Sequence, residues 1–78
     1  MTSDFSTLVA SFSVTAIVRE VLPKFGLAYL EDPSGRVWMV TQSCTGPGLA
    51  SMQPGDAFQL KLAQFDHQLF VSSYQPLP

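Results

Sequence analysis

Apolar and polar residues alternate along several short stretches of the chain. The clearest alternation covers residues 11–18, where serine and threonine separate the apolar side chains. Those apolar residues are Phe12, Val14, Ala16 and Val18. A period of two is typical of a β-strand with one buried face. Because Ile17 and Val21 have the opposite parity, we expect this strand to bend or to carry a bulge near them.

Proline and glycine clusters separate this strand from four further apolar segments. The segments expected to form strands are 25–31, 36–42, 57–63 and 68–74. A loop rich in Ser, Thr, Gly and Pro spans 43–53, and a short turn lies at 65–67. No interval between turn signals is long enough and 3.6-periodic enough to predict a helix, whereas short strands between turns are typical of an all-β barrel or sandwich.

The turn at 32–35 (Asp-Pro-Ser-Gly) predicts an antiparallel hairpin between the second and third segments. Side chains alternate across each strand, so Leu27 shares a face with Tyr29, and Trp38 shares one with Val40. If the turn pairs the two strands as its sequence suggests, these four side chains meet on the outer surface. The inward residues are then Ala28, Leu30, Val37 and Met39.

Five strands with one long connection after the third are the layout of a small Greek-key barrel such as the OB-fold. We therefore expect an all-β, five-stranded antiparallel barrel over 11–75. Residues 1–10 are expected to form a flexible arm. Residues 76–78 are expected to form a tail, because proline lacks the backbone donor that a sheet ladder uses.

Size and charge limit the class of protein. The chain has 78 residues and a formal charge of −2, with 46% apolar and 13% charged side chains. This composition is typical of one folded domain and lacks a strongly basic nucleic-acid footprint. The single Cys44 excludes a disulfide framework. The longest apolar run is far shorter than a membrane-spanning helix, and the start does not resemble a signal peptide, so we expect a cytoplasmic protein.

Two stretches of the central hairpin resemble the motifs of cold-shock domains. That family carries K-G-F-G-F-I on its second strand and V-F-V-H-F on its third. The matching stretches are FGLAYL at 25–30 and VWMVT at 37–41, and Met52–Asp56 is similar to the family's entry to strand four. The resemblance covers about residues 15–75. It implies an OB-fold that binds single-stranded nucleic acid on an aromatic platform.

The chain departs from that platform at most positions. The two aromatics of the first motif correspond to Leu27 and Tyr29, and those of the second correspond to Trp38, Val40 and Thr41. A tryptophan of the family's first strand is replaced by Glu20, and the lysine of the first motif by Phe25. Only Tyr29 and Trp38 keep a ring.

Two functions follow as hypotheses. The first is weak, sequence-tolerant binding of single-stranded RNA or DNA, with bases stacking on Tyr29 and Trp38 and with apolar contacts from Leu27 and Val40. Phosphates would meet three cations near one rim, which are Arg19, Lys24 and Arg36. The second hypothesis is that the same face binds a protein partner or a second copy of the chain, since Tyr and Trp are enriched at protein interfaces. The remaining alternative is that Tyr29 and Trp38 are simply packing residues of the core.

No residue pattern predicts an enzyme. His67 and Asp66 lie in a turn with no nucleophile or second histidine nearby, and the acidic residues do not form a catalytic pair. Cys44 has no neighbour in sequence that would activate its thiol. The sequence therefore predicts no catalytic residue, no metal site and no cofactor.

Overall fold

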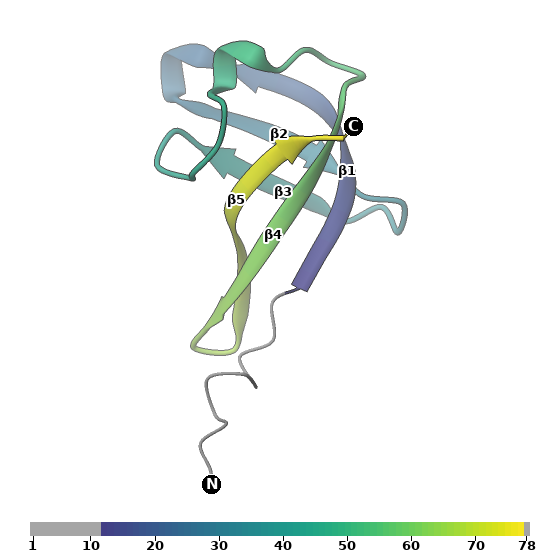
Figure 1. Cartoon of the computed structure of the whole chain (residues 1–78), viewed down its shortest axis with the longest axis vertical. Helices are drawn as coiled ribbons and strands as arrows, with labels where there is room; N and C mark the ends of the chain where they lie inside the picture. The colour runs from purple at the N-terminus through teal and green to yellow at the C-terminus, as the bar shows by residue number, and fades with distance from the viewer. Residues whose placement is uncertain (1–11, 78) are drawn as a thin grey trace, which may run out of the picture.

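The computed structural model describes residues 12–77, and the predicted arm at 1–10 lies outside them. The prediction of an all-β protein with five antiparallel strands is confirmed. The strands are β1 (Phe12–Leu22), β2 (Leu27–Glu31), β3 (Val37–Thr41), β4 (Ala57–Phe65) and β5 (Gln68–Pro76). Two single-turn 3-10 helices are η1 (Pro23–Phe25) and η2 (Leu49–Ser51). The strands form one sheet in the order β3-β2-β1-β4-β5, with β3 and β5 at its edges (Figure 1).

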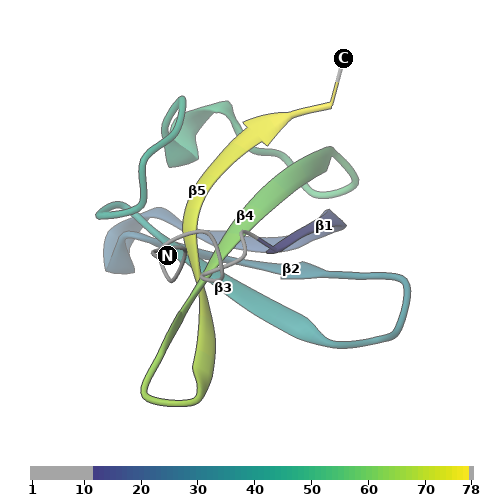
Figure 2. The same ribbon diagram turned by 60° about the horizontal axis from the view of Figure 1, so that its bottom comes forward.

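The long strand β1 joins the two hairpins of the sheet. Its first half, Phe12–Ile17, pairs with β4, and its second half, Ile17–Leu22, pairs with β2. The register shifts by one residue at Arg19, so the predicted bulge is confirmed. A bulge bends its strand and increases the local twist. The hairpin β4-β5 consequently crosses the hairpin β2-β3 at a steep angle, which Figure 2 shows.

The connection between β2 and β3 sets which residues of the two strands lie opposite each other. Gly35 N–H donates to the Asp32 carbonyl at 2.9 Å, and Asp32 N–H donates to the Arg36 carbonyl at 2.9 Å. The loop therefore has three residues, and its last one, Gly35, has φ 91°. A turn followed by a positive-φ glycine is a standard hairpin connection. It pairs Leu30 with Trp38.

The hairpin between β4 and β5 has a shorter loop of a different kind. Phe65 pairs with Gln68, which leaves only Asp66 and His67 between the strands, and both have positive φ. Two positive-φ residues define the turn that fits the natural twist of a two-residue hairpin. The strand β5 also runs further than predicted, to Pro76. The expectation that the tail begins at residue 76 is therefore wrong by one residue. Pro76 is tolerated as the last residue of an edge strand, where a missing N–H need not break a ladder.

The core lies on the inner face of the coiled sheet. All five strands contribute to it, and Met52 adds a side chain from the loop before β4. The buried residues are Ala16, Val18, Ala28, Leu30, Trp38, Val40, Met52, Phe58, Leu60, Leu62, Val71 and Tyr74. In β4 these are the residues that the period-two alternation predicts to be inward. In β1 the alternation correctly predicts Ala16 and Val18, but Phe12, expected on the same buried face, is 42% exposed.

Candidate interaction surface

The structure places Trp38 and Val40 on the opposite side of the hairpin from the predicted one. Both side chains are buried, with exposures of 5% and 0%, and they lie in the core beside Ala28 and Leu30. The expected outer position of these two residues is therefore wrong. Opposite Tyr29 lies Met39, and the expected inward position of Met39 and of Val37 is wrong as well.

The error comes from a single residue in the turn. Placing Tyr29 opposite Trp38 would need a two-residue loop between the strands, whereas the observed loop has three residues. Gly35 supplies the extra residue because it adopts a positive φ without a steric penalty. A shift of one residue moves every side chain of a strand to the other face.

The buried ring of Trp38 is held by polar contacts at its edge. Its Nε1–H donates to Asp32 Oδ2 at 2.9 Å, so the indole nitrogen is paired. The Arg36 guanidinium lies 4.1 Å from the ring centroid, which is a cation–π distance. Trp38 therefore fixes the turn end of the hairpin and has no face to offer a nucleotide base.

Asp32 organises the same turn through its carboxylate. Its Oδ1 accepts hydrogen bonds from Ser34 N–H, Ser34 Oγ–H and Arg36 N–H at 2.9, 2.6 and 3.1 Å. The hydrogen bond from the Ser34 hydroxyl, followed by that from Trp38, lowers the pKa of Asp32 from 3.8 to about 2. Donors aimed at a carboxylate stabilise its charged form. The turn thus depends on an ionised Asp32.

The outer face of β1, β2 and β3 carries apolar side chains that remain partly exposed. Across the strands lie the rows Ile17–Glu31–Val37 and Glu20–Tyr29–Met39. Val37 is 56% exposed and Met39 is 49% exposed, while Leu27 and Tyr29 are half-buried. We call Ile17, Leu27, Tyr29, Val37 and Met39 the apolar patch. Leu27 and Tyr29 lie on the predicted face, but Tyr29 is the only ring within this patch.

The three predicted phosphate-binding cations do not gather at one rim. Arg19, at the bulge, forms an ion pair with Glu31 at 2.8 Å. Arg36 stacks on the Trp38 ring. Lys24 lies in η1, which precedes β2, whereas the turn that contains Arg36 follows β2. Five residues of strand separate these two ends by roughly 15 Å. With Glu20 and Glu31 in its rows, the outer face carries no concentrated positive charge.

A groove of about 420 Å³ continues the apolar patch across the edge of β3 toward β5. Its walls come from Met39 and Thr41 on one side and from Phe70 on the other, and Cys44 and Val71 also line it. Phe70 is 48% exposed. Cys44 Sγ–H donates to the Val71 carbonyl at 3.3 Å, so the thiol joins the end of β3 to β5. We call this space the seam groove.

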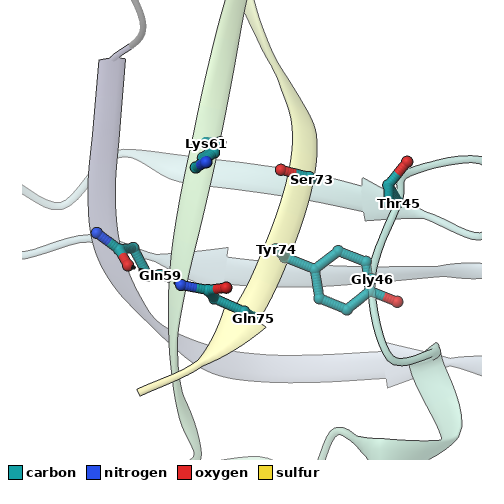
Figure 3. Close-up of a pocket in the computed structure, with 7 residues that line it drawn as sticks. All are labelled: Thr45, Gly46, Gln59, Lys61, Ser73, Tyr74 and Gln75. Atoms are coloured by element: carbon teal, nitrogen blue, oxygen red, sulfur yellow. Dashed lines mark hydrogen bonds between the residues drawn. The ribbon is translucent and has the colours of Figure 1, made fainter. Parts of the chain in front are cut away.

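A second hollow on the outer surface is lined mainly by polar residues. This polar cleft has a volume of about 290 Å³ and lies over β4 and β5, with the segment after β3 along its rim (Figure 3). Its lining residues are Thr45, Gly46, Gln59, Lys61, Ser73, Tyr74 and Gln75. Gln75 Nε2–H donates to Gln59 Oε1 at 3.2 Å. The outward alternation of Gln59 and Lys61 in the sequence is the signal that locates this face.

Tyr74 fixes the loop beside the polar cleft. The Tyr74 hydroxyl accepts a hydrogen bond from Gly48 N–H at 2.9 Å, and the backbone N–H of Tyr74 donates to the Thr45 carbonyl at 2.9 Å. A Cβ on Gly46 would lie 2.5 Å from the Tyr74 ring, so only glycine fits against the ring. Together with Thr45 N–H, which donates to the Ser72 carbonyl at 3.1 Å, these contacts cover part of the β5 edge.

Comparison with protein-family models, with curated proteins and with solved structures finds no match to this chain. The resemblance to cold-shock domains therefore stays a prediction. Within residues 12–77, no three His, Cys, Asp or Glu side chains come together as a group able to hold a metal ion. The same part of the chain contains no helix with the length and apolar character needed to cross a membrane.

Proposed function

We propose that this protein is a small β-sheet binding module that contacts a protein partner through the apolar patch and the adjoining edge of β3. The observation that carries the proposal is the half-exposure of Val37 and Met39 on an edge strand. Apolar side chains that gather on one exposed surface usually mark an interaction site.

The charges of the outer face also favour a protein partner. Arg19 is neutralised by Glu31, and Arg36 lies over an aromatic ring. Non-specific nucleic-acid affinity comes mainly from cations that displace counterions from phosphates. A face with few available cations and with two carboxylates in its rows suits a polypeptide surface better than a phosphate backbone.

The strand arrangement supports the same location for a binding surface. Two hairpins that share a long, bulged first strand, with the segment after β3 bridged to β5, resemble the layout of an OB-fold. OB-folds bind their ligands on the face of strands two and three. In this chain, that face is the apolar patch.

Photo-cross-linking in cells that express the protein tests the proposal. A photoreactive amino acid replaces Met39 in one variant and Lys61, which lies in the polar cleft, in a control variant. We expect a protein adduct from position 39 that is absent from position 61. Equal adducts at both positions, or none at position 39, would contradict the proposal.

Weak binding of single-stranded nucleic acid is a second candidate function. Two observations favour it, namely the OB-like strand arrangement and the half-buried Tyr29 ring at the centre of the outer face. One ring stacks about one base, worth roughly 1–3 kcal/mol. A titration with a short pyrimidine oligonucleotide at low salt tests this function. Shifts of the Tyr29 and Met39 amide resonances would support it, and unchanged spectra would exclude it.

A further inference from the structure

We propose that two copies of this chain pair through their β3 edges, antiparallel, with Val37 of each copy opposite Met39 of the other. This inference rests on the proposed function and names the partner. The argument depends on the backbone groups of β3, on the side chains beside them and on the size of the contact.

The backbone of β3 points alternately toward β2 and away from it. Asp32 N–H donates to the Arg36 carbonyl, and Gln42 N–H donates to the Gly26 carbonyl, both at 2.9 Å. In an antiparallel pair, every second residue directs both its N–H and its C=O to the neighbouring strand. Residues 36, 38, 40 and 42 therefore face β2. The intervening residues 37, 39 and 41 direct these groups to the open edge.

Only two of the three outward residues keep these groups available. Thr41 is engaged locally, because its N–H contacts Cys44 Sγ at 3.5 Å and its carbonyl accepts from Cys44 N–H at 3.0 Å. The N–H and C=O groups of Val37 and Met39 have no hydrogen-bond partner among residues 12–77. The open part of the edge is therefore short. Trp38 lies at its centre, and its Met39 end adjoins the seam groove, whose far wall is Phe70 of β5.

A two-fold axis beside Trp38 satisfies all of these groups. Val37 of one copy then exchanges two hydrogen bonds with Met39 of the other, and the symmetric pair exchanges two more. An interface with two-fold symmetry must be complementary to itself, and this register meets that condition. Val37 and Met39 are separated by one residue, so the two-fold axis places the outward N–H and C=O groups of each opposite those of the other in the second copy.

The side chains agree with this register. Val37 and Met39 of opposite copies become direct neighbours on the outer face, with Cβ atoms about 5 Å apart. Arg36 lies opposite Val40 of the second copy, so the pairing brings no like charges together. The five residues of β3 include no lysine, proline or bulge, which are the features that usually protect an exposed edge from pairing.

The size of the contact indicates a dimer that dissociates readily. A pairing of this length covers on the order of 300–400 Å² per copy, about half of the ~800 Å² that a stable complex buries. We therefore expect a dissociation constant of about 10⁻⁴ M, so that the protein is monomeric when dilute and partly dimeric at millimolar concentration.

Amide hydrogen exchange followed by NMR tests this pairing at two protein concentrations, about 20 µM and about 1 mM. For the dissociation constant given above, exchange at Val37 and Met39 slows about two- to fourfold at the higher concentration. Exchange at Trp38 and Val40 stays unchanged, because the ladder with β2 already protects these amides. Exchange at Val37 and Met39 that is independent of concentration would overturn the proposal.

Three variants test whether the dimer forms through the β3 edge or through the apolar patch. Sedimentation velocity measures the amount of dimer for each variant. Val37→Lys places a charge on the edge and is expected to abolish the dimer. Val37→Pro removes an outward donor without breaking the ladder with β2, and is expected to do the same. Ile17→Lys, on the same face but in the interior of the sheet, should leave the dimer intact. Loss of the dimer in the Ile17 variant alone would overturn edge pairing.

The cross-linking experiment distinguishes this proposal from the function on which it rests. An adduct at position 39 with the mass of two copies supports self-pairing. An adduct only with a different protein, together with a monomer at all concentrations, overturns self-pairing and leaves the proposed function supported.

Discussion

The two edges of the sheet differ in how their backbone groups are satisfied. At the β5 edge, the segment after β3 pairs with Ser72 and Tyr74 through Thr45, and Tyr74 holds that segment in place. At the β3 edge, Val37 and Met39 keep their outward groups without a partner among residues 12–77. The chain thus covers part of one edge by itself, whereas the outward groups of Val37 and Met39 at the other edge are the ones that the proposed second copy would pair with.

The covered edge is expected to be the more sensitive to a small substitution. Gly46→Ala places a Cβ against the Tyr74 ring, and relieving this clash displaces the covering segment. We expect a loss of about 2–3 kcal/mol in the free energy of unfolding, measured by urea denaturation. Thr45→Ala is the control, because Thr45 covers the edge through its backbone. An equal loss in both variants would show that the ring contact of Gly46 is unimportant.

Trp38 anchors the open edge in the core. Trp38→Phe removes the indole N–H that reaches Asp32 and leaves space in the core, so we expect a loss of about 1–3 kcal/mol in urea denaturation. Met39→Phe, on the outer face of the same strand, should change stability by less than about 0.5 kcal/mol. The reverse order would mean that Met39 rather than Trp38 is buried.

The hydroxyl of Tyr74 gives a smaller effect at the covered edge. Tyr74→Phe keeps the ring against Gly46 and removes only the acceptor of the Gly48 N–H. One hydrogen bond contributes about 1 kcal/mol, and thermal or urea unfolding measures the difference. A variant as stable as the parent would show that water replaces this contact without cost.

Asp32 makes the stability of the open-edge hairpin dependent on pH. Its pKa in the folded chain is about 2, below the ordinary 3.8. The stability that its ionised form contributes is therefore present above about pH 4 and is lost as the pH falls from about 4 to about 2. Asp32→Asn removes this dependence and sets an amide donor against the Trp38 N–H.

Urea midpoints at about pH 7, 4 and 2.5 measure this effect. We expect the Asp32→Asn variant to be less stable than the parent at neutral pH and to approach the parent as the pH falls. Asp66→Asn, which removes the same charge from the other hairpin turn, is the control. A constant difference between the parent and the Asp32 variant at every pH would contradict the role of Asp32.

The sequence was sufficient to predict five strands and the inward residues of β4, because one parity of β4 is apolar and the other is mostly polar. It placed the start of the second strand at residue 25, whereas β2 begins at Leu27 after η1, and it wrongly placed Phe12 on the buried face of β1. In β3 this signal is absent, since four successive residues, Val37–Val40, are apolar. Periodicity then cannot choose a face, and the turn decides it. The signal lay in Gly35, whose positive φ adds a residue to the loop.

The positions of the cations could not be predicted for a related reason. Arg19 meets Glu31 because it is the extra residue of a bulge, and the sequence located that bulge only approximately. The stacking of Arg36 on Trp38 depends on the register of β3. Because the sequence predicted the wrong register, it could not predict this contact. An error of one residue in the register changes every side-chain contact between two strands, whereas it does not change the prediction that the strands exist.

The register of the central hairpin is tested most directly by cross-strand NOEs between Hα protons. Residues in non-hydrogen-bonded antiparallel pairs bring their Cα atoms to about 4.5 Å, close enough for a strong Hα–Hα NOE. The observed pairing predicts this NOE between Tyr29 and Met39 and between Glu31 and Val37. An NOE between the Hα protons of Tyr29 and Trp38 instead would place the indole on the outer face and contradict the account.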